Sequence, residues 1–130
     1  MNSGGLKVLI AYRLLHIGAR IIQRVSRIPN VEIVAEAQGG DEVLLEIEQK
    51  KPDLVILDMF LSNATGLETL KKIKRLSPAT LVVMTSTSAF PLYRRECVKD
   101  GADYFFALPD EIEELNNAVV DLAGRADRLG

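Results

Sequence analysis

Short apolar runs rich in β-branched residues alternate with longer amphipathic segments along this chain. Five runs have the length and composition of strands: residues 7–11, 31–37, 54–58, 81–85 and 103–107. Strands that alternate with helical segments are typical of βα units feeding a parallel sheet, with right-handed crossovers that place helices on both faces. The pattern predicts an α/β fold, a doubly wound five-stranded parallel sheet.

The segments between the runs repeat their apolar positions at helical spacing, so each predicts a helix with one buried stripe. The stripes contain Leu14, Ile17, Ile21, Val25 and Ile28, then Val43, Leu44 and Ile47, then Leu67, Leu70, Ile73 and Leu76, and finally Ile112, Leu115, Val119 and Leu122. We expect the last helix to begin at Pro109, with acids from Asp110 to Glu114 at its positive end and Arg125 and Arg128 near its negative end.

Composition limits the classes of protein to which the chain can belong. With 130 residues, 48% of them hydrophobic and 26% charged, we expect one globular domain over 1–130, with an ordered core of about 6–123 and a flexible tail at 1–5. A net charge of -2 without a large Lys/Arg cluster argues against nucleic acid as a partner. No apolar stretch reaches the roughly 20 residues of a membrane span. The single cysteine, Cys97, favours a reducing, cytoplasmic location and is expected to pack against the sheet.

Candidate chemistry gathers where the predicted strands end. Asp58 closes the apolar run 54–57, and Thr85 and Ser86 close the next run along the chain. Because parallel strands all end at one edge of the sheet, these residues, Tyr12–Arg13 and Leu108 are predicted to share one crevice. A lone aspartate at a strand end is also a common turn former, so a structural role for Asp58 stays open.

Four motifs in the expected order carry a family resemblance over about residues 6–122: PDLVILD ending at Asp58, GLE from Gly66, VVMTS ending at Ser86 and GADYFF from Gly101. Together they resemble the receiver (CheY-like) domain of two-component response regulators. The resemblance implies a flavodoxin-like sandwich with strand order 2-1-3-4-5. It also implies that Asp58 accepts a phosphoryl group from a sensor histidine kinase, that Thr85 and Phe105 form the switch, and that Ser86 leaves room for the phosphoryl group.

The chain departs from the family at the positions that balance charge. Tyr12 and Arg13 stand where two acids hold Mg²⁺, and Leu108 stands where a lysine neutralises the phosphoryl group, which leaves Asp58 and the carbonyl of Phe60. Phosphoryl transfer needs such cations. We therefore expect no metal cofactor, no enzymatic activity of its own, weak or no Mg²⁺-dependent phosphorylation, and action through protein contacts. The alternative is a conventional receiver phosphorylated on Asp58. A nucleotide- or flavin-binding enzyme is disfavoured because no Gly-rich phosphate loop follows any run.

Two hypotheses concern the substituted positions and the partner surface. The Arg13 guanidinium could pair with the Asp58 carboxylate and hold one signalling conformation, or Arg13 could be exposed and Asp58 merely solvated. Tyr12 is expected to cap the crevice. By the resemblance, a homodimer could form through the fourth helix, fifth strand and fifth helix, at about 91–100, 103–107 and 109–122. The basic residues Arg94, Arg95 and Lys99 and the acids of 110–114 could pair across such a dimer, or they could simply form a solvated face.

Overall fold

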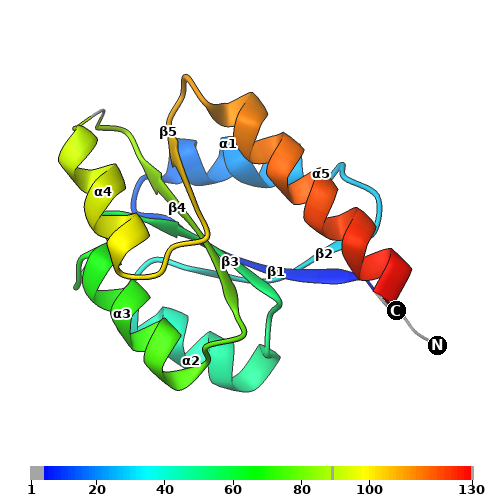
Figure 1. Cartoon of the computed structure of the whole chain (residues 1–130), viewed down its shortest axis with the longest axis horizontal. Helices are drawn as coiled ribbons and strands as arrows, with labels where there is room; N and C mark the ends of the chain where they lie inside the picture. The colour runs from blue at the N-terminus through cyan, green and yellow to red at the C-terminus, as the bar shows by residue number, and fades with distance from the viewer. Residues whose placement is uncertain (1–4, 89, 130) are drawn as a thin grey trace.

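The computed structural model describes residues 5–88 and 90–129, and the side chains as far as residue 126. Strands and helices alternate along these residues (Figure 1). The strands are β1 (Leu6–Ala11), β2 (Val31–Ala37), β3 (Leu54–Asp58), β4 (Leu81–Ser86) and β5 (Tyr104–Ala107). The helices are α1 (Leu15–Val25), α2 (Gly40–Lys50), α3 (Gly66–Leu76), α4 (Pro91–Lys99) and α5 (Ile112–Leu129). The α/β class predicted from the sequence is therefore confirmed.

The strands form one parallel sheet in the order β2-β1-β3-β4-β5, as the resemblance implied. α1 and α5 cover one face, and α2, α3 and α4 cover the other (Figure 1). In the register of the central strands, Asp58 of β3 lies opposite Thr85 of β4. Within the described residues, no helix combines the length and the apolar composition that crossing a membrane requires.

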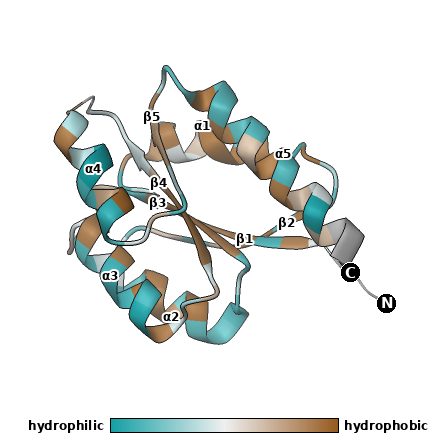
Figure 2. Cartoon of the chain, viewed as in Figure 1, coloured by the Kyte–Doolittle hydropathy of each residue, from teal (hydrophilic) through white to brown (hydrophobic). Residues whose placement is uncertain are grey.

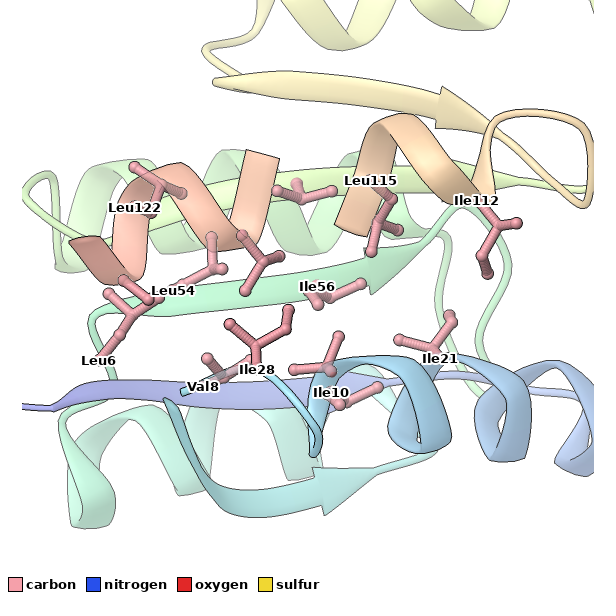
Figure 3. Packing of buried hydrophobic residues seen from close by; sticks show 14 of the residues in the cluster. Leu6, Val8, Ile10, Ile21, Ile28, Leu54, Ile56, Ile112, Leu115 and Leu122 are labelled. Atoms are coloured by element: carbon pink, nitrogen blue, oxygen red, sulfur yellow. The ribbon is translucent and has the colours of Figure 1, made fainter. Parts of the chain in front are cut away.

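Alternate residues of the central strands supply two separate cores, because successive side chains point to opposite faces of a sheet. Val8, Ile10 and Ile56 pack beneath α1 and α5 (Figure 3). Leu9 and Leu57 pack beneath α2, α3 and α4. Cys97 of α4 is fully buried in this second core, as predicted. Figure 2 shows the apolar residues concentrated in the strands and on one side of the helices.

Element boundaries differ from the sequence predictions at several ends. The last helix begins at Ile112 and not at Pro109, which lies in a turn together with Asp110 and Glu111. Glu111 is the reason: its carboxylate accepts a hydrogen bond from the Ala107 amide at 2.7 Å, so the chain is held in a turn. β1 starts one residue earlier than predicted and β4 ends one residue later, while β5 starts one residue later. Residues 1–4 of the predicted tail and the side chain of Arg128 lie outside the described residues.

Gly66 is the first residue of α3 and lies against the backbone at the end of β3. Its amide donates to the Met59 carbonyl at 2.6 Å, and a Cβ built on it would lie 2.1 Å from the Asp58 carbonyl oxygen. Thr65, the preceding residue, forms a capping box with Glu68 that fixes the first turn of α3. Close backbone approach therefore requires glycine at position 66.

Gly66→Ala is expected to destabilise the fold by about 3 kcal/mol, because the added methyl group meets backbone atoms that cannot rotate away. Urea unfolding followed by circular dichroism measures the loss. Gly5→Ala is the control, since its Cβ would lie 3.4 Å from its nearest neighbour, and its effect should stay within about 0.5 kcal/mol. Equal effects of the two substitutions would contradict this account of Gly66.

Candidate functional site

Asp58 lies at the carboxyl end of β3 and is half-buried. One carboxylate oxygen accepts a hydrogen bond from the Phe60 amide at 3.0 Å, and the other accepts a long one from the Arg13 amide at 3.4 Å. The loops after β1 and β3 therefore meet at this carboxylate, as the parallel topology predicted. Two backbone amides hold it, and neither carries a full positive charge.

Burial raises the pKa of Asp58 above its ordinary value. The hydrogen bonds from the Phe60 and Arg13 amides and the more distant charge of Arg13 each lower this pKa, but together they do not offset desolvation. The net direction is upward, so the ionised carboxylate is less favourable here than in water. Among the described side chains, none forms an ion pair with the Asp58 carboxylate.

The predicted pair between the Arg13 guanidinium and Asp58 is wrong. The Arg13 side chain is exposed, and the ion pairs found among the described side chains do not include one between these two residues. Arg13 reaches Asp58 through its backbone amide, because it lies in the loop directly after β1. The alternative of an exposed Arg13 is the one that the structure bears out.

Tyr12 is a core residue, so the prediction that it caps the crevice is wrong. Only 5% of its surface is exposed, and its ring packs in the α1–α5 core so closely that a Cβ on Gly18 would lie 2.4 Å from it. Its hydroxyl donates to a carboxylate oxygen of Glu36 at 2.8 Å, which raises the pKa of Tyr12. The hydroxyl is therefore engaged on β2, away from Asp58.

Thr85 and Ser86 lie beside Asp58 and are both buried. The Thr85 carbonyl accepts a hydrogen bond from the Met59 amide at 2.8 Å, which ties β4 to the loop after Asp58. The Ser86 hydroxyl accepts one from the Ser88 amide at 3.0 Å. Two hydroxyl residues are thus brought to the edge where the sequence placed them.

Leu108 follows β5 at the same edge, and its side chain is 5% exposed. It packs in the α1–α5 core together with Tyr12. Its amide donates to the Ser86 carbonyl at 2.7 Å, which fixes the end of β5 against β4. The position offers an apolar contact and no charged donor.

Phe60 extends outward from the loop after β3, with 42% of its surface exposed. Its ring meets Tyr93 of α4 edge to face, with the ring centroids 5.9 Å apart.

The described residues contain no cluster of three or more His, Cys, Asp or Glu side chains that could hold a metal ion. Asp58 is the carboxylate that the sequence analysis assigned to this edge.

Phe105 is held by a clamp that the sequence analysis missed, formed by Arg94 of α4 and Glu111 before α5. The guanidinium of Arg94 lies 5.0 Å from the centre of the buried Phe105 ring and donates to the Phe105 carbonyl at 2.9 Å. It also donates to Glu111 at 2.8 Å. Glu111 in turn accepts from the Ala107 amide, and both this bond and Arg94 lower the pKa of Glu111. We call these two residues the Arg94–Glu111 clamp.

Replacing Asp58 with Asn should stabilise the protein at about pH 7, because the folded state then no longer carries a poorly solvated charge. A raised pKa means that the folded state binds the Asp58 proton more tightly than the unfolded state does. The advantage of Asp58→Asn is therefore largest above the folded pKa and disappears as the pH falls to the ordinary carboxyl value of 3.8. Urea unfolding at a series of pH values tests this.

Asp110→Asn serves as the control, since Asp110 is exposed in the turn before α5 and should give no gain at neutral pH. A stability gain for Asp58→Asn that does not depend on pH would rule out the electrostatic explanation.

The Arg94–Glu111 clamp should contribute a coupling energy of about 1 kcal/mol. Its hydrogen bonds are charge-assisted and therefore strong, but both side chains are partly exposed, and solvent weakens the attraction between them. Arg94→Gln, Glu111→Gln and the double variant form a cycle that measures it by urea unfolding. The Asp121–Arg125 pair on α5 is the matched control, because it joins adjacent turns of one helix and should couple by about 0.3 kcal/mol. A clamp coupling no larger than that of the control would show that the contact is incidental.

Comparison with known proteins places the chain in a family. The model of the response regulator receiver domain matches residues 16–120, a stretch that includes Asp58, Thr85 and Leu108 and begins after Tyr12 and Arg13. The chemotaxis protein CheY of Listeria monocytogenes is 29% identical over 99 residues, which are 76% of this chain and 83% of that protein.

Two further matches agree. The nitrate/nitrite response regulator NarL of Escherichia coli is 32% identical over 97 residues, which are 75% of this chain but 45% of that protein. The solved receiver domain of a putative response regulator NarL from Mycobacterium tuberculosis superposes with a TM-score of 0.83 at 22% identity, covering 92% of this chain and 97% of that one. The chain therefore belongs to the response regulator receiver domain family of two-component signalling.

Proposed function

We propose that this receiver domain signals through protein contacts in a fixed conformation, and that Asp58 undergoes weak or no Mg²⁺-dependent phosphorylation. One observation carries the proposal: core side chains fill one of the two positions that the family uses for metal-binding acids and the position of its lysine, and the exposed Arg13 stands at the other acid position. Tyr12 is buried with its hydroxyl turned to Glu36, and Leu108 is buried in the same core. Neither side chain can compensate charge at Asp58.

The electrostatics of Asp58 support this proposal. Phosphorylation would add negative charge to a carboxylate whose pKa is already raised by burial. Transfer of a phosphoryl group depends on cations that neutralise its equatorial oxygens. Arg13, the cationic residue whose charge lowers the pKa of Asp58, is exposed and donates a hydrogen bond to Asp58 through its backbone amide. Asp58 alone does not supply the charge balance that transfer requires.

The donor set also argues against a resident Mg²⁺ ion. Mg²⁺ prefers a near-octahedral shell of oxygen ligands with one or two carboxylates. Asp58 would supply the carboxylate ligand at this edge, and its oxygens already accept hydrogen bonds from the Arg13 and Phe60 amides. The hydroxyl of Tyr12 is directed to Glu36. The residues present do not fit the family's metal site.

The Arg94–Glu111 clamp is the basis for proposing a single conformation. A switch through Phe105 requires its ring to move, and Arg94 holds the ring, the Phe105 carbonyl and the turn before α5 together. The clamp therefore takes the role that the sequence analysis gave to Arg13. It acts from the α4 side of the sheet rather than from the loop after β1.

We propose signalling proteins, including a sensor histidine kinase, as partners in the cytoplasm, and a homodimer through α4, β5 and α5 as a possible assembly. Arg94 and Glu111 are already paired within the chain, and Glu113 pairs with Arg24 of α1. Exposed Arg95 and Lys99 therefore provide the basic side of that surface.

The proposal is tested by incubating the protein with acetyl phosphate and Mg²⁺ and measuring its intact mass. We expect no more than a few percent of the chains to gain one phosphoryl group, because the charges needed to stabilise transfer are missing (roughly a 10²-fold or larger loss in rate). Arg13→Asp adds a carboxylate at an exposed position beside Asp58, so it should increase Mg²⁺-dependent labelling.

Asp58→Asn identifies any label that belongs to this site, and a receiver that retains both acids and the lysine is the positive control. Near-complete labelling of the wild-type chain that requires both Asp58 and Mg²⁺ would establish the alternative, a conventional phosphoacceptor.

A further inference from the structure

A groove opens between α2 and α3 at the end of the sheet opposite Asp58. The two helices lie side by side on one face of the sheet (Figure 1). Their last turns and the residues that lead into β3 and β4 enclose a cavity of about 960 Å³, which we call the α2–α3 groove. Asp53 lines the groove and precedes β3, whereas Asp58 ends that strand, so about 17 Å of extended backbone separates them. A ligand in the groove would therefore not touch Asp58.

The lining of the α2–α3 groove is mainly apolar. Ile47 and Ile73 belong to the buried core, and Leu44 is half-buried. Leu45 is 51% exposed and Leu76 is 70% exposed. The sequence pattern assigned Leu76 to the buried stripe of α3, but the last turn of that helix presents it to solvent. An apolar molecule in the groove would remove these two leucines from water, which favours its binding.

Negative charge dominates the polar part of the lining. Glu48 and Asp53 supply two carboxylates, and Lys51 supplies one ammonium. All three side chains are exposed, and the ion pairs found among the described side chains include none of them. The Lys51 ammonium donates a long hydrogen bond, 3.5 Å, to the Glu48 carbonyl. Its charge is thus directed to the end of α2 and not to either carboxylate.

The helix ends add to this negative character. Lys51 and Ser77, the C-caps of α2 and α3, both line the α2–α3 groove. The carbonyl end of a helix carries a partial negative charge, so two such ends meet at the groove. A cation is attracted by this arrangement, and an anion is repelled.

We infer that the α2–α3 groove binds a small apolar molecule that carries one positive charge, such as a protonated aryl or alkyl amine. The apolar body would cover Leu45 and Leu76, and the ammonium would lie beside Glu48 and Asp53. One oxygen of Asp53 accepts a hydrogen bond from the Lys7 amide at 2.8 Å, which fixes the carboxylate while its second oxygen can accept from a ligand. The inference does not depend on phosphorylation of Asp58.

A small molecule fits the α2–α3 groove better than a second protein does. The volume of the groove lies within the range of roughly 300–1,000 Å³ that is usual for small-molecule sites. A stable protein interface involves roughly 20–30 residues on each side, and two exposed leucines at the ends of two helices supply little of that.

An NMR titration of the isotope-labelled chain can test the inference with tryptamine as the probe. Tryptophol and indolepropionate carry the same ring system with a neutral and an anionic group. We expect chemical-shift changes to concentrate at residues 44–53 and 73–81. Tryptamine should bind roughly tenfold more tightly than tryptophol, indolepropionate should bind most weakly, and added salt should reduce the preference for tryptamine.

Two variants separate the charged and the apolar contributions. Glu48→Gln/Asp53→Asn should abolish the preference for tryptamine and leave the affinity for tryptophol within about twofold. Leu76→Ser should weaken the binding of both probes by roughly fivefold, because the ring loses an apolar partner. Asp110→Asn/Glu114→Gln is the matched control, since it removes the same charge at exposed positions near the start of α5 and should change neither affinity by more than about twofold.

Urea midpoints show whether each variant is folded, and the comparison of the three probes on the wild-type chain needs no variant. Equal affinity for the three probes, or a preference for tryptamine that persists in Glu48→Gln/Asp53→Asn, would overturn the inference. Tighter binding of indolepropionate would assign the α2–α3 groove to an anion held by Lys51. Chemical shifts of Leu45 and Leu76 that change with protein concentration alone would assign it to a second copy of the chain. Either of these results would also overturn the inference.

Discussion

The candidate site of this domain depends on one carboxylate, that of Asp58, which is half-buried at the end of β3 and has no ion-pair partner among the described side chains. Asp58 is stabilised by the Phe60 and Arg13 amides, and burial still raises its pKa. Receiver chemistry needs a carboxylate that can take on further negative charge, and that capacity is set by the groups around it. In this chain Tyr12 and Leu108 have become part of the α1–α5 core. Neither side chain offers a charge to Asp58, because the Tyr12 hydroxyl donates to Glu36 and the Leu108 side chain is apolar.

The free edge of the sheet shows a second consequence of packing. β5 is an edge strand, and unpaired backbone groups on such a strand invite pairing with other chains. Arg94 donates to the Phe105 carbonyl and Glu111 accepts from the Ala107 amide, so the clamp covers part of this edge. Because Arg94 also lies over the Phe105 ring, edge protection and the position of the ring are linked.

The two helices of the α1–α5 layer differ in the charges that they expose. α1 exposes basic residues, while the start of α5 is acidic, and the Arg24–Glu113 pair joins the two helices.

Sequence alone determined the strands, the apolar stripes, the strand order through the family resemblance, and the gathering of Asp58, Thr85 and Ser86 at one edge. The strands and stripes follow from hydrophobic periodicity, which is a local property of the chain. The strand order joins residues as distant in sequence as Val8 and Leu54, and it was available only through the family resemblance. Tertiary structure decided where long side chains go: the Arg13 guanidinium to solvent, the Tyr12 hydroxyl to Glu36, and Arg94 to Phe105 and Glu111. The direction of each of these side chains depends on its partner, which lies up to 24 positions away in the sequence. A flexible side chain can adopt several rotamers, and only the folded chain brings one particular partner within its reach.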